Sequence, residues 1–561
     1  MLSLRCFIKT NKIFILKDKI AKLGAVLPLV LLSWNLSAQP LFLESNANIL
    51  PYALILVVAF LILGAVYLIS ESFVRMEARD MGVDTTKNNF SILPNRQELF
   101  GAKVEGPAAG KNIIYLKKGF DIKLEGAAEY TVDENASVST FAIQPKNFIG
   151  MSPIPKVEVE VGDEVKAGDV IFYDKKNPVI KYCAPVSGEI VAVNRGEKRS
   201  IAEIVILGDK EMKYKTLAQF DLENCSRQEL IEYMMENGAW PHIRQRPYNV
   251  IADHNVTPKA IFVSTFDSAP LAPDLDIIIA GRDKEFQVGL DVLNKLTNGK
   301  VHLGLDAKDA DPSPTYVDAM GVEKHWIHGD HPAGNVGVQI HHIDAINAGE
   351  KVWTVGVQDV ATIGSLFLEG IYDTERVVAI AGAELNTPKY VTTYLGANMG
   401  DLVNNNLKSE HVRFISGDVL SGIQKTKAQF LDFFDDQVSV IAEGDEYEMF
   451  GWLVPQSPRP SISPTFLSNL IGAGGYVANT NTHGEGRAFV VSGQYEQVMP
   501  MDIYPQHLIK SIMVNDLERM EGLGIYEVVE EDVALCEFVC TSKQPVQQIL
   551  REGLATMMDQ E

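Results

Sequence analysis

The feature that most constrains this chain is an apolar run without a single charged residue, Ile49–Ser70. About 20 such residues are enough to cross a ~30 Å hydrocarbon core at about 1.5 Å per residue. Few helices in the core of a soluble protein are apolar on every face. We therefore predict a transmembrane helix over residues 49–70.

Residues 1–38 have the layout of a secretory signal. A basic stretch is followed by a short apolar run, Leu23–Trp34, and by small residues at Ser37 and Ala38. The basic residues are Arg5, Lys9, Lys12, Lys17, Lys19 and Lys22. This segment is either a cleaved signal or a first membrane segment, and the sequence leaves the two open.

Charge asymmetry around the second run predicts its orientation. Arg75, Arg79 and Lys87 follow the run, whereas the flank before it holds only Glu44. The positive-inside rule places the side richer in arginine and lysine in the cytoplasm. We expect a bacterial cytoplasmic (inner) membrane protein with the bulk of the chain on the cytoplasmic side, joined to its helix by a linker over residues 76–112.

The charge and the cysteines exclude several classes of function. A formal net charge of -23 excludes nucleic acid as a partner, because phosphate binding needs a basic face. The five cysteines are too few and too scattered for a disulfide framework. Cys536 and Cys540 are spaced C-x3-C rather than C-x2-C, so we expect a buried apolar pair and no metal site.

Residues 113–240 are predicted to form an N-terminal β domain. The stretches Val157–Ile171 and Ala184–Val193 alternate apolar and polar residues between V-G-D and A-P-V-S-G turns. This pattern is typical of a barrel-sandwich hybrid, the half-barrel fold of biotinyl and lipoyl domains.

Residues 241–388 alternate apolar strands with amphipathic helices, which predicts a parallel α/β domain. The expected strands are 260–264, 276–282, 301–305, 352–356 and 376–382, with helices near 285–296 and 361–368. No G-x-G-x-x-G follows a strand, so the domain is expected to be Rossmann-like without a phosphate loop.

The remaining chain predicts two further parts. Residues 389–442 mix strands with a short helix near 401–405, which favours a β-grasp-like unit. Residues 443–561 are predicted to be mainly helical, most clearly over 505–523 and 545–557. The fold class expected is multidomain α/β plus β, with a membrane helix before it.

Several motifs, in order, carry a family resemblance over about residues 113–555. They are Ile114-Tyr-Leu-Lys-Lys-Gly-Phe-Asp-Ile122, Ala239-Trp-Pro-His-Ile-Arg-Gln-Arg-Pro-Tyr248, Pro258–Ala272, His331-Pro-Ala-Gly334, Tyr495–Ile503 and Glu530–Cys540. With them the chain resembles the A subunit (NqrA) of the bacterial sodium-translocating NADH:quinone reductase.

Two related families fit less well. The C subunit of Rnf-type electron-transport complexes has similar domains but carries C-x2-C runs for iron–sulfur clusters, and this chain has none. The flavoprotein subunit of respiratory complex I binds FMN and NADH through a glycine-rich loop. The matching stretch, Asn237–Arg246, has only Gly238.

The resemblance implies a subunit of a membrane complex that couples NADH oxidation and quinone reduction to sodium export. It implies a chain that binds no cofactor itself, with quinone as substrate and FAD, FMN, riboflavin and iron–sulfur centres in the other five subunits. The membrane-embedded B subunit is the expected neighbour, and the N-terminal helix the membrane contact. The alternatives are a purely structural assembly role and, from the signal-like start, an exported binding protein.

The resemblance yields no catalytic residue and three quinone-proximal candidates: His331, His341 and Arg487. Each could donate a hydrogen bond to a quinone carbonyl in an apolar cleft. The family's H-x-H after His331 stands here as Gln339-Ile-His341. The spacing His325-x2-His328-x2-His331 falls in a segment rich in glycine and proline, so no metal site is predicted.

Overall fold

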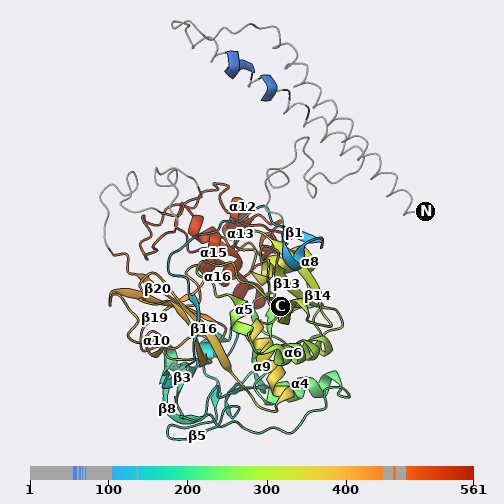
Figure 1. Ribbon diagram of the computed structural model, residues 1–561, viewed down its shortest axis with the longest axis vertical. Helices are drawn as coiled ribbons and strands as arrows, with labels where there is room; N and C mark the ends of the chain where they lie inside the picture. Colours follow the sequence, from blue (N-terminus) through green and yellow to red (C-terminus); the bar gives the residue numbers. More distant parts are fainter. Residues whose placement is uncertain are drawn as a thin grey trace, which may run out of the picture. The chain divides into compact units, whose positions relative to one another are not determined.

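The computed structural model describes residues 104–134, 137–445, 459–462 and 475–560, together with helical positions 55–59, 62–64, 66 and 70 (Figure 1). The chain divides into two compact units, Met1–Lys103 and Val104–Glu561. Each unit is described by itself.

In the first unit, the helical residues Ile55 and Leu56 expose 63% and 70% of their surface. The segment at 1–38, most of 49–70 and the linker up to residue 103 lie outside the described residues. Within the part of the chain that is described, no helix combines the length and the apolar character needed to cross a membrane. The transmembrane helix at 49–70 stays a prediction.

Within the second unit, residues 140–208 form a β sandwich, as predicted. A four-stranded antiparallel sheet faces a three-stranded one, and Ile171, Phe172, Ile190 and Ile206 are fully buried in the core. The strands are β3 (Thr140–Ile143), β9 (Ile201–Gly208), β8 (Gly188–Arg195) and β5 (Glu164–Val165) in one sheet, and β4 (Lys156–Val157), β6 (Val170–Asp174) and β7 (Asn177–Cys183) in the other. The barrel-sandwich hybrid is confirmed.

A seven-stranded sheet forms the centre of the α/β domain, and it is mixed rather than parallel. Its order is β1 (Ile113–Tyr115), β14 (Glu323–His328), β13 (Val301–Asp306), β12 (Ile261–Ser264), β15 (Val352–Thr354), β10 (Arg244–Arg246) and β11 (Val250–Ile251). The first five run parallel, whereas β10 pairs antiparallel with both neighbours. The expectation of an all-parallel sheet is wrong at this edge: β10 runs opposite to β15, and Tyr248 and Asn249, both with positive φ, then turn the chain back into β11.

Helices α6 (Asp283–Leu296) and α9 (Val357–Leu368) pack side by side over this sheet (Figure 1). Two glycines allow their close approach. A Cβ on Gly289 would lie 2.1 Å from the carbonyl oxygen of Val360, and one on Gly364 would lie 1.7 Å from that of Glu285. Any side chain at either position would push the helices apart.

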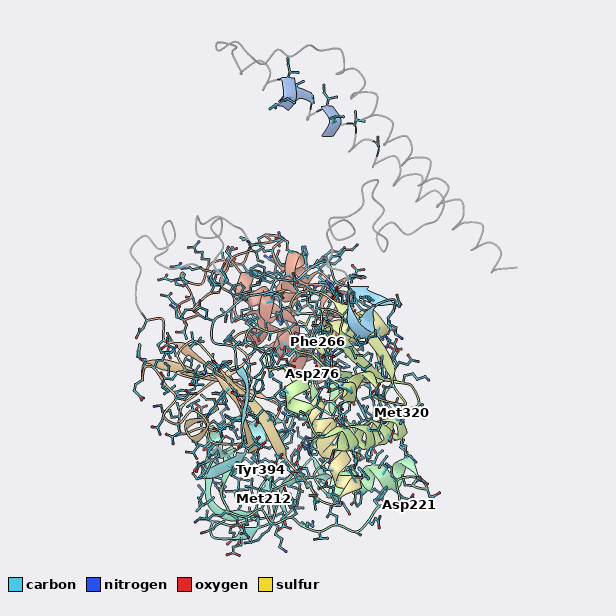
Figure 2. The ribbon with its side chains drawn as sticks, in the orientation of Figure 1. Met212, Asp221, Phe266, Asp276, Met320 and Tyr394 are labelled. Carbon is cyan, nitrogen blue, oxygen red and sulfur yellow. The ribbon has the colours of Figure 1, made fainter. Side chains whose placement is uncertain are left out.

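The strand expected at 276–282 is wrong. These residues begin within helix α5 (Leu275–Ile279), which Asp274 caps by accepting the backbone N–H of Asp276 at 3.0 Å. The Asp276 carboxylate, labelled in Figure 2, accepts the backbone N–H of Ser313 at 2.8 Å. Three consecutive isoleucines favour a strand, but the cap and the tertiary contact select a short helix instead.

A fourth sheet has six strands. Its order is β19 (Ile423–Lys425), β18 (Val412–Ser416), β20 (Gln437–Ala442), β16 (Glu375–Ala381), β17 (Lys389–Tyr394) and β2 (Glu129–Asp133), with the short helix α10 (Met399–Leu402) beside it. The segment 376–382, expected in the α/β sheet, is β16 of this sheet. Its partners β17 and β20 lie later in the chain.

The C-terminal part is helical, as predicted. It comprises α12 (Tyr495–Val498), α13 (Pro505–Met513), α14 (Leu517–Gly522), α15 (Glu530–Val539) and α16 (Val546–Met558). The single helix expected over 505–523 is two, because Asn515 adopts a positive φ between them. Cys536 and Cys540 are both buried and free, in agreement with the expected apolar pair.

Candidate functional site

His331 is buried directly after β14, with 3% of its surface exposed. Its backbone N–H donates to Asp121 at 2.7 Å, and its Nδ1 lies 3.1 Å from the Ser268 hydroxyl. Burial lowers the pKa of His331, and the carboxylates of Asp418 and Asp121 oppose that shift. Among the described residues its Nε2 has no hydrogen-bond partner. The ring is therefore a neutral group set into the protein interior.

His341 lies on α8 (Val336–Asp344), and its two ring nitrogens are both engaged. Nδ1 is 2.6 Å from Glu527, and Nε2 accepts the backbone N–H of Asp502 at 3.0 Å. These contacts tie α8 to the C-terminal region. They leave His341 no free nitrogen for a ligand in this arrangement.

Arg487 is exposed on a surface segment. Its backbone N–H donates to Ser542 at 2.9 Å, and its carbonyl accepts from the Gln544 amide at 2.5 Å. Among the described residues, no hydrogen bond or ion pair joins Arg487 to His331 or to His341. The structure therefore places the three sequence-predicted residues at three separate positions.

A cavity of about 720 Å³ opens where the C-terminal helices meet the chain near 122–124 and 477–483. Its apolar wall consists of Ile122, Leu124, Val419, Leu420, Ile441, Ile462, Val477, Ala534, Phe538 and Val539. Its polar groups include Arg459, Asn481, Thr482, His483, Thr541, Lys543, Gln544 and Gln547. The cavity thus combines an apolar face with several hydrogen-bond donors.

The cations at this cavity influence one another. Partial burial lowers the pKa of His483, and the charges of Arg459 and Lys543 lower it further. Partial burial also lowers the pKa of Lys543, and Arg487 adds to that shift, although Cys540 opposes it. Arg459 and Lys543 therefore bring positive charge to the cavity, which the carboxylate of Glu537 also lines.

Of the three sequence-predicted residues, Arg487 is the one that lies near this cavity, and its role at a quinone stays a prediction. His483, Lys543 and Gln544 line the cavity, whereas Arg487 lies beside it and acts on Lys543 through its charge. No local signal marks Lys543. The backbone hydrogen bond from Arg487 to Ser542 brings the two segments together.

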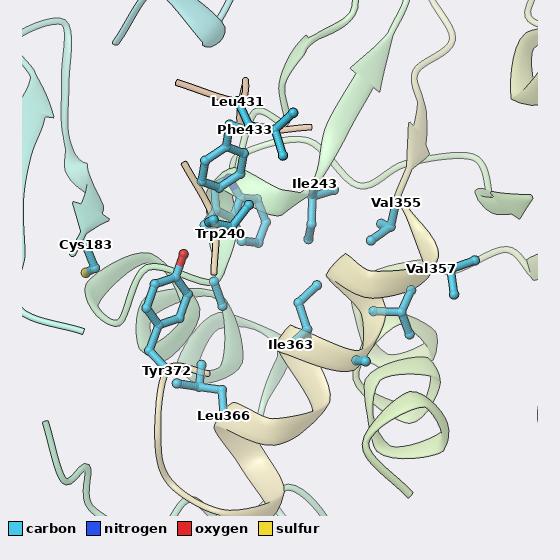
Figure 3. Close-up of a cluster of buried hydrophobic side chains, with 14 of the residues drawn as sticks. Cys183, Trp240, Ile243, Val355, Val357, Ile363, Leu366, Tyr372, Leu431 and Phe433 are labelled. Carbon is cyan, nitrogen blue, oxygen red and sulfur yellow. The ribbon is translucent and has the colours of Figure 1, made fainter. Parts of the chain in front are cut away.

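A second region of interest is the turn at residues 237–246, in which Gly238 is the only glycine. Trp240 is fully buried there, donates its indole N–H to Ala252 at 2.8 Å and meets Trp353 edge to face at 5.4 Å. Figure 3 shows its ring packed within the apolar cluster that contains Tyr372 and Phe433. The volume beside this turn is filled by aromatic side chains.

A buried charge network lies next to that cluster. Asp359 on α9 lies 2.7 Å from Nδ1 of His242 and accepts a hydrogen bond from Arg376. The Tyr372 hydroxyl is 2.9 Å from the other ring nitrogen of His242. Burial opposes the charge on Asp359, but Arg376 and His242 outweigh it and hold the pKa of that carboxyl well below its usual range. Because its members pair with one another, this network stabilises the core.

Three family models match consecutive parts of the chain. The NqrA N-terminal barrel-sandwich hybrid domain matches residues 114–209, the NqrA second alpha/beta domain matches 225–372, and the NQRA C-terminal domain matches 377–427. All three matches fall within the second compact unit.

Full-length relatives agree. The A subunit of the Na(+)-translocating NADH-quinone reductase of Psychromonas ingrahamii is 37% identical over 446 residues, which cover 79% of this chain and 99% of that protein. The corresponding protein of Saccharophagus degradans is 39% identical over 79% of this chain and 98% of its own length. That of Yersinia pseudotuberculosis is 38% identical over 80% of this chain and 100% of its own length.

Solved structures offer a weaker likeness. An air-oxidized NAD+-reducing [NiFe]-hydrogenase aligns with 41% of this chain and 52% of its own chain, at a TM-score of 0.28 and 10% identity. That likeness carries no argument.

Proposed function

The chain belongs to the NqrA family, the A subunits of the Na(+)-translocating NADH-quinone reductase, and from this membership we propose that it forms part of the quinone-binding region of that membrane complex. The observation that carries the proposal is the cavity of about 720 Å³, in which an apolar wall faces His483, Lys543 and Gln544. A quinone ring needs apolar surroundings and a donor near each carbonyl.

The hydrogen-bond donors of the cavity come from two different segments of the chain. His483 belongs to the segment 477–483, whereas Lys543 and Gln544 precede α16, so they can approach a planar ligand from different elements. Arg487 supports this arrangement as a positioning residue beside Lys543. For His331 and His341 we propose an indirect role: each is held by its own contacts within the protein and positions the segment that it belongs to.

We also propose that the chain holds neither flavin nor an iron–sulfur centre, and that electrons reach the quinone from such centres in the other subunits. Trp240 fills the core at the turn where a flavoprotein would need an open glycine loop. The four described cysteines are single and free, with Cys183, Cys536 and Cys540 buried.

Attachment to the cytoplasmic membrane, with residue 90 onward on the cytoplasmic side near the B subunit, completes the proposal. It rests on the apolar run Ile49–Ser70 and on the charges that follow it. A periplasmic reporter fused after residue 120 should stay inactive. Activity of that fusion would reverse the topology.

The quinone proposal can be tested with a photoreactive quinone analogue on the assembled reductase. Labelled peptides of this chain should fall within 477–483 and 534–547, and Lys543→Ala and His483→Ala should each reduce the labelling. Lys166→Ala, an exposed lysine of the β sandwich, is the matched control and should label normally. Labelling confined to partner subunits would favour a purely structural assembly role.

A further inference from the structure

Two histidines and a glutamate converge on one face of the seven-stranded sheet, far in sequence from the cavity residues. His302 on β13 lies opposite Glu323 on β14, and His325 lies opposite Gly304 in the same register. Residues paired across parallel strands point to the same face, as do residues two apart along one strand. The register therefore aims all three side chains to one side, where the Gln339 amide packs against the backbone of Gly304.

The distances bring their ligand atoms together. Nδ1 of His302 is 2.9 Å from Nε2 of His325 and 3.7 Å from a carboxylate oxygen of Glu323. One ligand atom from each residue lies within 4.8 Å of the other two. Two nitrogens bound tetrahedrally at about 2.0–2.1 Å would be roughly 3.3 Å apart, so small ring rotations would admit an ion.

We propose that His302, His325 and Glu323 form a binding site for a divalent transition-metal ion of the zinc class. Two imidazoles and one carboxylate are a donor set that such ions prefer, with water completing the coordination. In a direct hydrogen bond between the two rings, one ring donates a single proton to the other, and Glu323 takes no part in that bond. A cation between them satisfies all three groups.

The surroundings support binding. The Phe262 ring stacks on His302 at 4.6 Å and fixes its plane, whereas Glu323 is half exposed and gives solvent access. Metal binding requires both imidazoles in their neutral form, so the affinity for the ion should fall in acid. Asp344 adds negative charge, and Lys300, 3.9 Å from Glu323, is the competing cation.

This site differs from the three-histidine spacing in the sequence. Along strand β14, His325 and His328 are three residues apart and so point to opposite faces. His328 packs against Tyr115, and His331 contacts Ser268. The partner of His325 is instead His302 on the neighbouring strand, which no spacing within residues 325–331 could reveal.

Calorimetric titration of the purified full chain with Zn²⁺ alone tests the proposal. We expect one equivalent to bind, and His325→Ala or Glu323→Gln to weaken binding at least about tenfold. His411→Ala is the matched control, because His411 also lies beside a carboxylate, Asp445 at 3.1 Å, on another sheet. It should bind Zn²⁺ as the unaltered chain does.

A thermal measurement separates binding from folding. Zn²⁺ should raise the unfolding midpoint of the unaltered chain and of His411→Ala, but not that of His302→Gln/His325→Gln. Glu323→Gln changes a half-exposed side chain and should fold normally without the metal. Equal Zn²⁺ binding by the unaltered chain and by the double variant would overturn the proposal.

Discussion

The guanidinium of Arg246 donates to the carboxylate of Asp532 at 3.0 Å, and each of the two residues exposes only 1% of its surface. This ion pair joins strand β10, next to the edge strand β11 of the seven-stranded sheet, to helix α15. Glu531 accepts a second hydrogen bond from Arg246 at 2.7 Å. The antiparallel edge of the sheet is thereby fixed to the C-terminal helices.

Replacing Arg246 should destabilise the protein strongly. Burial raises the pKa of Asp532 to about 6 although Arg246 opposes that shift, so without Arg246 the buried carboxyl would be either charged and unpaired or forced to take up a proton. Arg246→Met should lower the free energy of unfolding by about 3–5 kcal/mol, measured by urea denaturation. Arg246→Met/Asp532→Asn should recover much of the loss. Equal stability of the single and double variants would contradict this account.

The close packing of helices α6 and α9 predicts that a methyl group added at their contact lowers the stability of the protein. Gly289→Ala and Gly364→Ala should each cost about 1–3 kcal/mol, although alanine is the better helix former, because their Cβ atoms meet backbone carbonyls. Gly522→Ala on α14 is the control, since a Cβ there meets nothing within 4 Å. It should be neutral or stabilising in the same denaturation experiment.

His242 predicts a loss of stability in mild acid. Burial lowers the pKa of His242, against the opposing effect of Asp359. Below its ordinary value of about 6.5, the unfolded chain binds a proton that the native chain does not, so stability falls as pH decreases, by at most about 1.4 kcal/mol per unit. The stability difference between the unaltered chain and His242→Gln should therefore shrink from pH 7.5 to pH 5.5. If the stability difference between the two proteins stays constant over this pH range, His242 is not the cause of the loss of stability in acid.

The purified chain should show no visible absorption from flavin or iron–sulfur centres. The reason is the filled core around Trp240 and the lack of any C-x2-C pair. An absorption spectrum, with the assembled reductase as positive control, is the measurement. Stoichiometric flavin peaks in the isolated chain would refute the prediction.

Deleting residues 1–90 should weaken attachment but not turnover. The apolar run holds no charge that could carry an ion, and tethering raises the effective concentration at an interface by about 10²–10⁴. The shortened chain should therefore wash off membranes under salt or detergent, while reductase that stays assembled turns over normally. Collapse of sodium transport in fully assembled reductase would give the segment a role in the mechanism.

Local patterns predict much of this architecture. The alternation around Val157–Ile171 is enough to indicate the sandwich, since it matches the alternating burial of residues 156–160 and depends on the local sequence alone. The segment 376–382 is recognisable as a strand, but its sheet is not, because its partners β17 and β20 are set by the fold. Asp274 is a residue typical of helix caps, but the helix at 275–279 is still hard to predict. The isoleucines that follow Asp274 favour a strand.

The cavity is less accessible to prediction. Arg487 is a plausible donor for an apolar cleft, yet His483 and Lys543 line the cavity itself. Lys543 follows a helix end and carries no motif. Lys543 lies at the cavity because two segments distant in sequence pack together there. The residue types within either segment alone do not predict that packing.

The first two strands of the second unit each lie at the edge of a different sheet, β1 beside β14 and β2 beside β17. Asp133 at the end of β2 and its ion-pair partner Lys389 are 256 residues apart in the chain. At about 5–20 residues per second, a ribosome needs roughly 13–50 s to make the intervening chain. During synthesis both strands emerge long before their partners exist, so chaperones that shield exposed β-strands would act first on residues 113–133.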